Sequence, residues 1–249
     1  MLFRSLTEAT LLRRYKRFLA DVRLPCGTEV TAHCPNPGSM LGLAQPGMRV
    51  LLWQAPPGEK ARKLKWSWKF VEADGAMVCV DTMLANKLFK EAFTAGRLPE
   101  FSGYSSIEAE HKYEDSRFDF YLQGTAGSAM VEVKSVSLLE LSEQGEKLAA
   151  FPDARTERGL KHLETLRSLS LKGGDQSVQF YVVARGDTRA FKPADSIDPA
   201  YGRALRQAHA QGVAVHCRAV EIKLEPCGEH CFDLEMTLAE TLPLLLKEP

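Results

Sequence analysis

The chain has 249 residues, and its 32 Lys+Arg are balanced by 32 Asp+Glu, so the formal net charge at pH 7 is zero. With 45% apolar and 26% charged residues it has the composition of a globular protein with one or two domains. No apolar run reaches the ~18 residues that span a bilayer, and no apolar stretch typical of a signal peptide follows the start. These features exclude a disordered or membrane-spanning chain and predict a cytoplasmic protein without a membrane partner.

The neutral total conceals an uneven distribution of charge. Residues 1–72 hold 12 Lys+Arg against 5 Asp+Glu, whereas residues 73–249 hold 20 against 27, so the two parts carry +7 and −7. The cations of the first part form two groups: Arg13, Arg14, Lys16 and Arg17, and then Lys60, Arg62, Lys63, Lys65 and Lys69. A basic part beside an acidic part favours a polyanionic partner. The alternative is that these are solvated faces, or that the two parts attract each other.

The first 82 residues are predicted to form short strands separated by turns rich in Pro and Gly. The β-prone runs are Arg17–Leu24, Glu29–Cys34, Arg49–Ala55, Lys65–Ala73 and Ala76–Thr82. Five strands in a small domain suit an oligonucleotide-binding (OB) β-barrel. Aromatic residues lie among the cations, as a base-stacking platform on a basic groove requires, although each is also a candidate for the core: Tyr15, Phe18, Trp53, Trp66 and Trp68.

Helical spacing begins after residue 82, and we therefore divide the chain into domains 1–82 and 83–249. The predicted helices are 83–95, Thr156–Leu171 and Ala200–Gln211. The predicted strands are Ile107–Glu114, Arg117–Gln123, Ala129–Val136, Ser177–Arg185 and Val213–Val220. This order predicts a mixed sheet with helices packed on its faces.

Two of the predicted strands carry polar residues at positions that suggest a site. Strand periodicity puts Phe118 and Phe120 on one face and Asp119 on the other, and it puts Glu132 and Lys134 on a common face. A short loop joins these strands, which we expect to pair antiparallel. Asp119 and Glu132 would then lie side by side, with Lys134 next to them.

Two carboxylates on neighbouring strands offer hard oxygen ligands to Mg²⁺ or Mn²⁺. Such a metal polarises a phosphodiester and activates water, and Lys134 would orient the nucleophile or neutralise developing negative charge. The alternative is a polar sheet surface that faces solvent.

The order of elements around Asp119, Glu132 and Lys134 resembles the PD-(D/E)xK nuclease superfamily. Longer strings resemble the sugar fermentation stimulation protein family over nearly the whole chain: Arg14–Phe18, His33–Met40, Gly103–Ser106, Ser116–Asp119, Glu132–Val136 and Phe151–Leu163. The resemblance implies an OB domain followed by a nuclease-like domain. It also implies DNA binding that is largely independent of sequence, and a role in regulating sugar catabolism, of maltose in particular.

The resemblance further implies that Asp119 and Glu132 bind the metal and that Lys134 is catalytic. Glu91 on the preceding helix and Glu110 on the preceding strand compete as a further acid. Arg158 and His162 lie four residues apart on one helix face and are expected to reach phosphate. The residues expected to contact nucleic acid are Arg13, Arg14, Lys16, Arg17, Lys63, Lys65, Trp66, Arg117, Arg158 and His162.

The six cysteines are scattered along a chain without a recognisable secretory signal, which favours reduced thiols. Cys227, His230 and Cys231 offer soft ligands, but no second Cys/His pair stands at zinc-site spacing. A metal site at that point is therefore not expected.

Two functions are compatible with these features, and a third is considered beside them. The first is a DNA-binding protein with a Mg²⁺-dependent phosphodiester-cleaving site, acting on single- or double-stranded DNA. The second is a regulator that binds DNA through a nuclease-like scaffold without turnover. An enzyme acting on sugars would need its carboxylates arranged as a glycosidase pair, for which the sequence gives no support.

Overall fold

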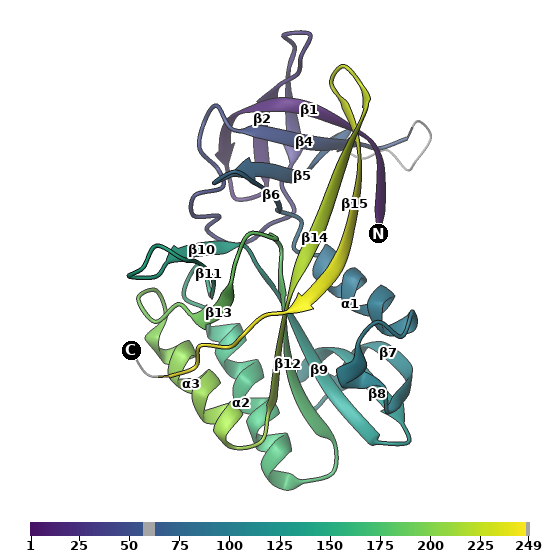
Figure 1. The fold of residues 1–249 in the computed structure, drawn as a ribbon, viewed down its shortest axis with the longest axis vertical. Coiled ribbons are helices and arrows are strands. Elements are labelled where there is room, and N and C mark those ends of the chain that lie inside the picture. The colour runs from purple at the N-terminus through teal and green to yellow at the C-terminus, as the bar shows by residue number, and fades with distance from the viewer. Residues whose placement is uncertain (57–62, 248–249) are drawn as a thin grey trace.

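The structure is a computed structural model that describes residues 1–56 and 63–247 (Figure 1). The strands of its first part are β1 (Leu2–Tyr15), β2 (Leu19–Arg23), β3 (Glu29–His33), β4 (Arg49–Gln54), β5 (Trp66–Ala73) and β6 (Ala76–Cys79). The helices that follow are α1 (Leu84–Thr94), α2 (Glu157–Lys172) and α3 (Pro199–Ala210), with a 3₁₀ turn at Pro99–Phe101. The remaining strands are β7 (Tyr104–Tyr113), β8 (Ser116–Gly124), β9 (Gly127–Val136), β10 (Leu138–Leu141), β11 (Lys147–Phe151), β12 (Gln176–Val183), β13 (Ala190–Pro193), β14 (Ala214–Gly228) and β15 (Cys231–Thr241).

The first part is a closed ring of five strands, β1-β2-β3-β5-β4, in which β2 and β4 both pair with β1. The predicted OB-type fold is confirmed, but its membership differs from the prediction. β1 was not predicted, and β6 lies outside the ring, where it pairs with β5. Two irregularities of register, between Phe3 and Leu6 and between Leu11 and Arg13, break the alternation in β1 on which strand prediction relies.

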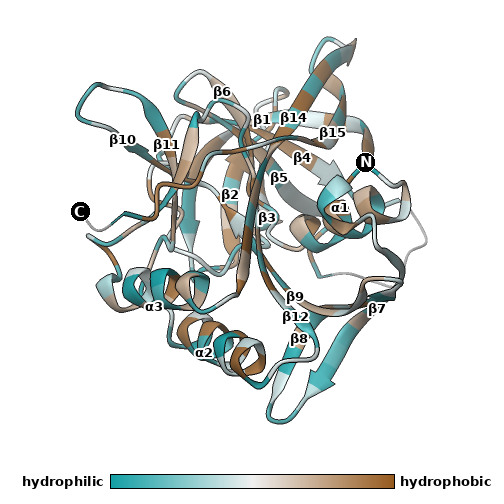
Figure 2. Cartoon of the chain, turned by 60° about the horizontal axis from the view of Figure 1, so that its bottom comes forward, coloured by the Kyte–Doolittle hydropathy of each residue, from teal (hydrophilic) through white to brown (hydrophobic). Residues whose placement is uncertain are grey.

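The second part is the predicted mixed sheet flanked by helices. β9, β12 and β14 are parallel, and β8 and β7 extend the sheet antiparallel at one edge. α1 covers one face, whereas α2 and α3 lie together on the other (Figure 2). The apolar residues divide accordingly into one core around Phe89 and Phe180 and another around Leu163 and Tyr201. A small sheet, β10-β11-β13, was not predicted.

A long hairpin connects the two parts of the molecule. β14 continues well beyond the predicted end at Val220, and β15 returns to pair antiparallel with both β14 and β1. One sheet of twelve strands therefore runs through both parts, and Figure 1 shows the hairpin rising beside β1. Within the described ranges, no helix is long and apolar enough to cross a membrane.

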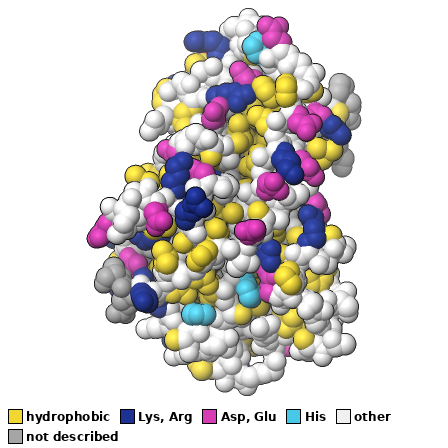
Figure 3. Space-filling model, in the orientation of Figure 1, with side chains coloured by type: hydrophobic (Ala, Val, Ile, Leu, Met, Phe, Trp, Pro, Cys, Tyr) yellow, Lys and Arg dark blue, Asp and Glu magenta, His cyan; other side chains and the backbone are white. Residues whose placement is uncertain are grey.

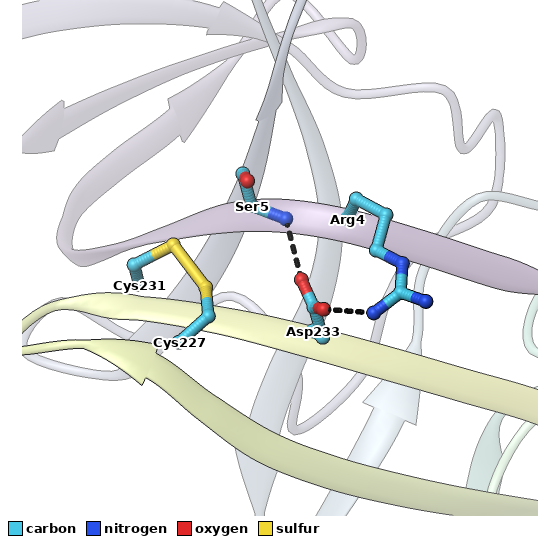
Figure 4. The surroundings of a disulfide bond; sticks show 5 residues. All are labelled: Arg4, Ser5, Cys227, Cys231 and Asp233. Carbon is cyan, nitrogen blue, oxygen red and sulfur yellow. Dashed lines mark hydrogen bonds and ion pairs between the residues drawn. A yellow bond between two sulfur atoms is a disulfide. The ribbon is translucent and has the colours of Figure 1, made fainter.

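The tip of this hairpin corrects the expectation of six reduced cysteines. Cys227 and Cys231 are joined by a disulfide, because the turn brings their Cα atoms to 5.2 Å (Figure 4). Below the tip, the Asp233 carboxylate accepts hydrogen bonds from the Arg4 side chain and the Ser5 N–H, which fastens β15 to β1 (Figure 4). Cys26, Cys34, Cys79 and Cys217 are free thiols.

The strand that carries Asp119 also departs from the predicted pattern. Phe118 packs in the core beside α2, whereas Phe120 packs in the core beside α1, so the two rings do not share a face. The pairing of β8 with β9 ends at Phe120 opposite Val131. Beyond that point the Asp119 carboxylate accepts the N–H of Val133 at 2.8 Å, which replaces a backbone partner. β8 therefore turns between the two cores at Asp119.

Candidate metal and nucleic-acid site

A cleft of about 420 Å³ lies between the OB part and the second part. The turn Asn36–Gly38 forms one wall, and the opposite wall comes from the segment between β11 and α2 and from the start of that helix. The polar side chains of the cleft include Asn86, Asp119, Glu132, Lys134, Arg155 and Arg158. The predicted carboxylates and lysine thus line one cavity.

Glu132 is buried, with 3% of its surface exposed. Its Oε1 accepts hydrogen bonds from Lys134 Nζ and pairs with His162 Nδ1, both at 2.5 Å, while its Oε2 has no partner. Burial raises the pKa of this carboxyl, but the His162 hydrogen bond and the Lys134 charge outweigh it and hold the pKa below its ordinary value. The site therefore keeps a buried anion with one unused oxygen.

Asp119 lies beside Glu132 with both of its oxygens engaged. Oδ2 accepts from the Val133 N–H at 2.8 Å, and Oδ1 accepts from Asn86 Nδ2 at 2.6 Å. Burial and the neighbouring charge of Glu132 raise the pKa of Asp119 to about 6. Asn86 was not predicted, because a single amide on a helix carries no spacing signal that points to a site.

The residues fit a small hard cation on chemical grounds. Glu132 has a buried carboxylate oxygen without a partner, and it lies next to Asp119, whose pKa is raised. A divalent cation bound between the two carboxylates would relieve their repulsion. Among the described residues, no group of three or more His, Cys, Asp and Glu is arranged to hold a metal. The protein would therefore supply two carboxylates, and water or phosphate would complete the shell.

The two further acids considered from the sequence do not line this cleft. Glu91 is half-exposed on α1 and binds the N-terminal amine of Met1 at 3.0 Å and Arg97 at 3.1 Å. Glu110 is exposed at an irregularity of β7, where its φ is 60°, and it pairs with Arg117 at 3.3 Å. Both acids precede Asp119 on neighbouring elements, but neither side chain reaches the cleft. On α1, Glu91 lies beside the N-terminus, and at the positive φ of β7 Glu110 faces solvent.

The wall formed by the OB part is fixed by direct contacts. Ser39 Oγ donates to the Asp153 carbonyl at 2.5 Å, and the Met40 N–H donates to the Asp153 carboxylate at 3.1 Å. Arg14 donates to the Asn36 and Gly38 carbonyls, each at 2.9 Å. A Cβ on Gly38 would lie 2.4 Å from the Asp153 carboxylate, so only glycine allows this close approach.

Much of the basic charge of the first part is used within the protein. Several of its cations form ion pairs: Arg4–Asp233, Arg13–Asp21, Arg23–Glu29, Arg49–Glu8, Arg49–Glu72 and Lys69–Asp81. Figure 3 accordingly shows cationic and acidic side chains intermixed on the visible face rather than one basic expanse. Lys16, Arg17, Lys63 and Lys65 are exposed. Lys60 and Arg62 lie outside the described residues.

The remaining predicted contacts fall into two groups. Arg158 is exposed on the first turn of α2 and lines the cleft, as does Arg155 just before that helix. His162 is 4% exposed and lies beneath Glu132, so the expectation that it reaches phosphate is wrong. His162 lies on the same side of α2 as Arg158 but one turn further from the helix start, where its ring packs beside Phe118. Trp66 is partly buried against the OB core, and Trp68 is wholly inside it.

A ring of OB type, joined to a mixed sheet that presents carboxylates and a lysine in a cleft, defines a two-domain protein with a candidate nucleic-acid site. The family model described as "SfsA N-terminal OB domain" matches residues 12–80, and that described as "Sugar fermentation stimulation protein RE domain" matches residues 83–226. The chain belongs to the sugar fermentation stimulation protein family.

Relatives support this assignment over the full length. The sugar fermentation stimulation protein homolog of Geobacter metallireducens is 47% identical over 97% of both chains, and that of Pelobacter propionicus is 46% identical over 97% of this chain and 98% of its own. The solved structure of Pyrococcus furiosus SfsA in complex with Ca²⁺ is similar with a TM-score of 0.82 and 25% identity, and the match covers 98% of this chain and 97% of that one.

Proposed function

We propose that this protein binds DNA and cleaves its phosphodiester backbone at the cleft, with the help of Mg²⁺ or Mn²⁺. The observation that carries the proposal is the Glu132 carboxylate, which is buried in the cleft beside Asp119 with Oε2 unused. Burying a charged oxygen without a partner is costly. An arrangement of this kind is expected where a ligand absent from the free protein takes the remaining oxygen.

A bound metal would polarise the phosphodiester and lower the pKa of an attacking water. The protein's own residues would hold the reacting groups in place. Lys134 is fixed by its ion pair with Glu132, which keeps its ammonium group next to the carboxylates for the charge that develops on phosphate. His162 fixes Glu132 from below, and Asn86 fixes Asp119 from α1.

Two further observations support the proposal, one for an anionic substrate and one for a divalent cation. Arg155 and Arg158 line the opening without an acidic partner among the described residues, so their charges are available to phosphate. The Pyrococcus furiosus relative is described in complex with Ca²⁺, a hard cation that takes oxygen ligands. For this chain, a divalent cation between Asp119 and Glu132 is part of the proposal.

The alternative is a DNA-binding regulator of sugar catabolism, such as that of maltose, which uses the same scaffold without turnover. It is favoured by the names of the relatives, which refer to the stimulation of sugar fermentation. A regulator gains nothing from an unpaired buried carboxylate oxygen beside the place where phosphate would lie. We therefore prefer the nuclease.

Cleavage of supercoiled and of single-stranded circular DNA in Mg²⁺ or Mn²⁺ tests the proposal. The wild-type protein is expected to cut. Glu132→Gln is expected to lose activity by about a hundredfold or more, as large a loss as removing one group that stabilises transition-state charge, because it withdraws one of the two carboxylates that would hold the metal. Glu110→Gln is the matched control, because Glu110 is an exposed acid outside the cleft, and it should cut like the wild type.

Cutting that persists unchanged in Glu132→Gln would overturn the site. DNA binding without cutting in the presence of either metal would support the alternative, a DNA-binding regulator without turnover. Chelation with EDTA should abolish cutting and leave binding measurable, since the cations at the opening do not depend on the metal.

A further inference from the structure

The size of the cleft limits what can reach the carboxylates. Its volume of about 420 Å³ is near the lower end of the range of pockets that enclose small molecules. Glu132 lies at its base with 3% of its surface exposed. A single nucleotide is small enough to enter a cavity of this size. A flexible single strand can bring its phosphate down to Glu132 more readily than a duplex, which is stiff over ~150 base pairs.

Hydrogen bonds connect the two walls of the cleft, so the walls are not free to move apart. Ser39 and Met40 of the OB part bind Asp153 of the second part through two hydrogen bonds. Thr82 donates its N–H and its hydroxyl to the Pro35 carbonyl, at 3.3 and 3.2 Å, next to the same turn. Widening the cleft for a duplex would break these contacts together.

A path for a single strand lies next to one wall. The Arg14 guanidinium donates to the Arg17 carbonyl at 3.0 Å as well as to the Asn36 and Gly38 carbonyls, so the turn between β1 and β2 abuts the cleft wall. That turn presents Lys16 and Arg17 to solvent with positive φ values. Within the described part of the chain, neither cation has an acidic partner.

An aromatic ring stands at the end of the same turn. Phe18 is 43% exposed and stacks on His33, with ring centroids 6.5 Å apart. Exposed rings beside cations are what unpaired bases use for stacking, because a base in a duplex has both faces covered by its neighbours. Arg155 and Arg158 continue the basic lining on the opposite wall.

From these features we infer that the substrate is a single strand of nucleic acid, which passes over Lys16, Arg17 and Phe18 and enters the cleft as individual nucleotides. The inference rests on the proposed function for the chemistry at Asp119 and Glu132. What it adds to the proposed function is the class of substrate, a single strand, and the residues that select it.

The test compares a single-stranded oligonucleotide, the same sequence as a blunt duplex, and a duplex with a single-stranded tail. In Mg²⁺ or Mn²⁺, the single strand and the tail are expected to be cut at least about tenfold faster than the blunt duplex. Binding by Glu132→Gln in EDTA should show the same order. Phe18→Ala should weaken single-strand binding at least about fivefold, as the loss of one base–aromatic stack does.

Two controls match the variants in type and lie away from the path. Arg17→Ala should also weaken binding of the single strand. Arg23→Ala is its control, because it removes an exposed cation that is paired with Glu29 at the other end of β2. Leu171→Ala removes an exposed apolar side chain at the end of α2, for comparison with Phe18→Ala. Both controls should bind the single strand like the parent, with unchanged thermal unfolding in all four variants.

The outcomes separate the two claims. Equal cutting of single strand and duplex would overturn the inference and leave the proposed nuclease intact. If nothing is cut, the proposed nuclease fails, and the binding series alone decides the inference. Equal affinity for single strand and duplex, or no loss in Phe18→Ala, then overturns it, whereas tenfold preference for the single strand supports it.

Discussion

Glu132 and Asp119 are adjacent carboxyls whose pKa values are shifted in opposite directions by their surroundings. Glu132 receives a lysine and a histidine and keeps its pKa low despite burial, whereas Asp119 receives only neutral donors and has its pKa raised. The pair resembles other sites in which like charges are forced together for function at a cost in stability. This cost is measurable without any ligand.

Asp119→Asn is therefore expected to stabilise the metal-free protein near neutral pH. The folded-state pKa of about 6 lies above the ordinary value of 3.8, so the folded state holds this proton more tightly than the unfolded state. The free energy of unfolding then falls as pH rises between these values and stays lower above them. Asn carries no charge, so the free energy of unfolding of Asp119→Asn should exceed that of the wild type by about 1 to 3 kcal/mol near pH 8 and by little near pH 4.

Urea unfolding in EDTA at a series of pH values measures this difference. Asn keeps an oxygen that can accept the Val133 N–H, and Asn86 can rotate its amide so that its oxygen accepts from the new NH2 group, so the local fold should survive. An Asn variant that is less stable than the wild type by the same amount at every pH would contradict the assignment of the strained carboxyl.

At the scale of elements, β8 and β9 explain how much of the site the sequence could predict. The strands and their antiparallel pairing follow from alternation and a short turn, and Glu132 and Lys134 share a face as a period of two requires. The turn of β8 at Asp119 was not predictable. It depends on a side chain that replaces a backbone partner, which no local pattern records.

The same limit applies to β1, β15 and the turn at Asn36–Gly38. β1 has an irregular register and acquires its order from β2, β4 and β15, which are distant in sequence. The turn is recognisable from Asn, Pro and Gly, but its place against Asp153 comes from the packing of two domains. Sequence patterns thus predict elements and faces, whereas contacts between domains require the structure.

At the level of the whole molecule, a second cluster of ion pairs around the buried Arg185 side chain joins the two parts. Arg185 follows β12, its side chain is 0% exposed, and it binds Asp187 at 2.6 Å and Asp74 of the β5–β6 turn at 3.2 Å. Lys147 joins the cluster through Asp187 and the Asp74 carbonyl. β6 contacts the same segment through the bridge between Val78 and Arg185.

Arg185→Met should destabilise the protein by about 1 to 3 kcal/mol, since it removes charged hydrogen bonds to Asp187 and Asp74, while Asp187 keeps its ion pair with Lys147. Urea unfolding near neutral pH measures the loss. Arg23→Met is the matched control, because its ion pair with Glu29 is exposed and contributes little. A loss for Arg185→Met no larger than that of the control would show that the cluster does not join the domains.

The proposed function depends on whether Asp119 and Glu132 bind a divalent cation together. Isothermal titration of the wild-type protein with Mn²⁺, without DNA, measures this most directly, with Asp119→Asn, Glu132→Gln and Glu110→Gln titrated in parallel. We predict one site per chain, weakened at least about tenfold in each cleft variant because each carboxylate supplies one of two protein ligands, and unchanged in Glu110→Gln. Undiminished Mn²⁺ binding in both cleft variants would contradict a metal site formed by Asp119 and Glu132.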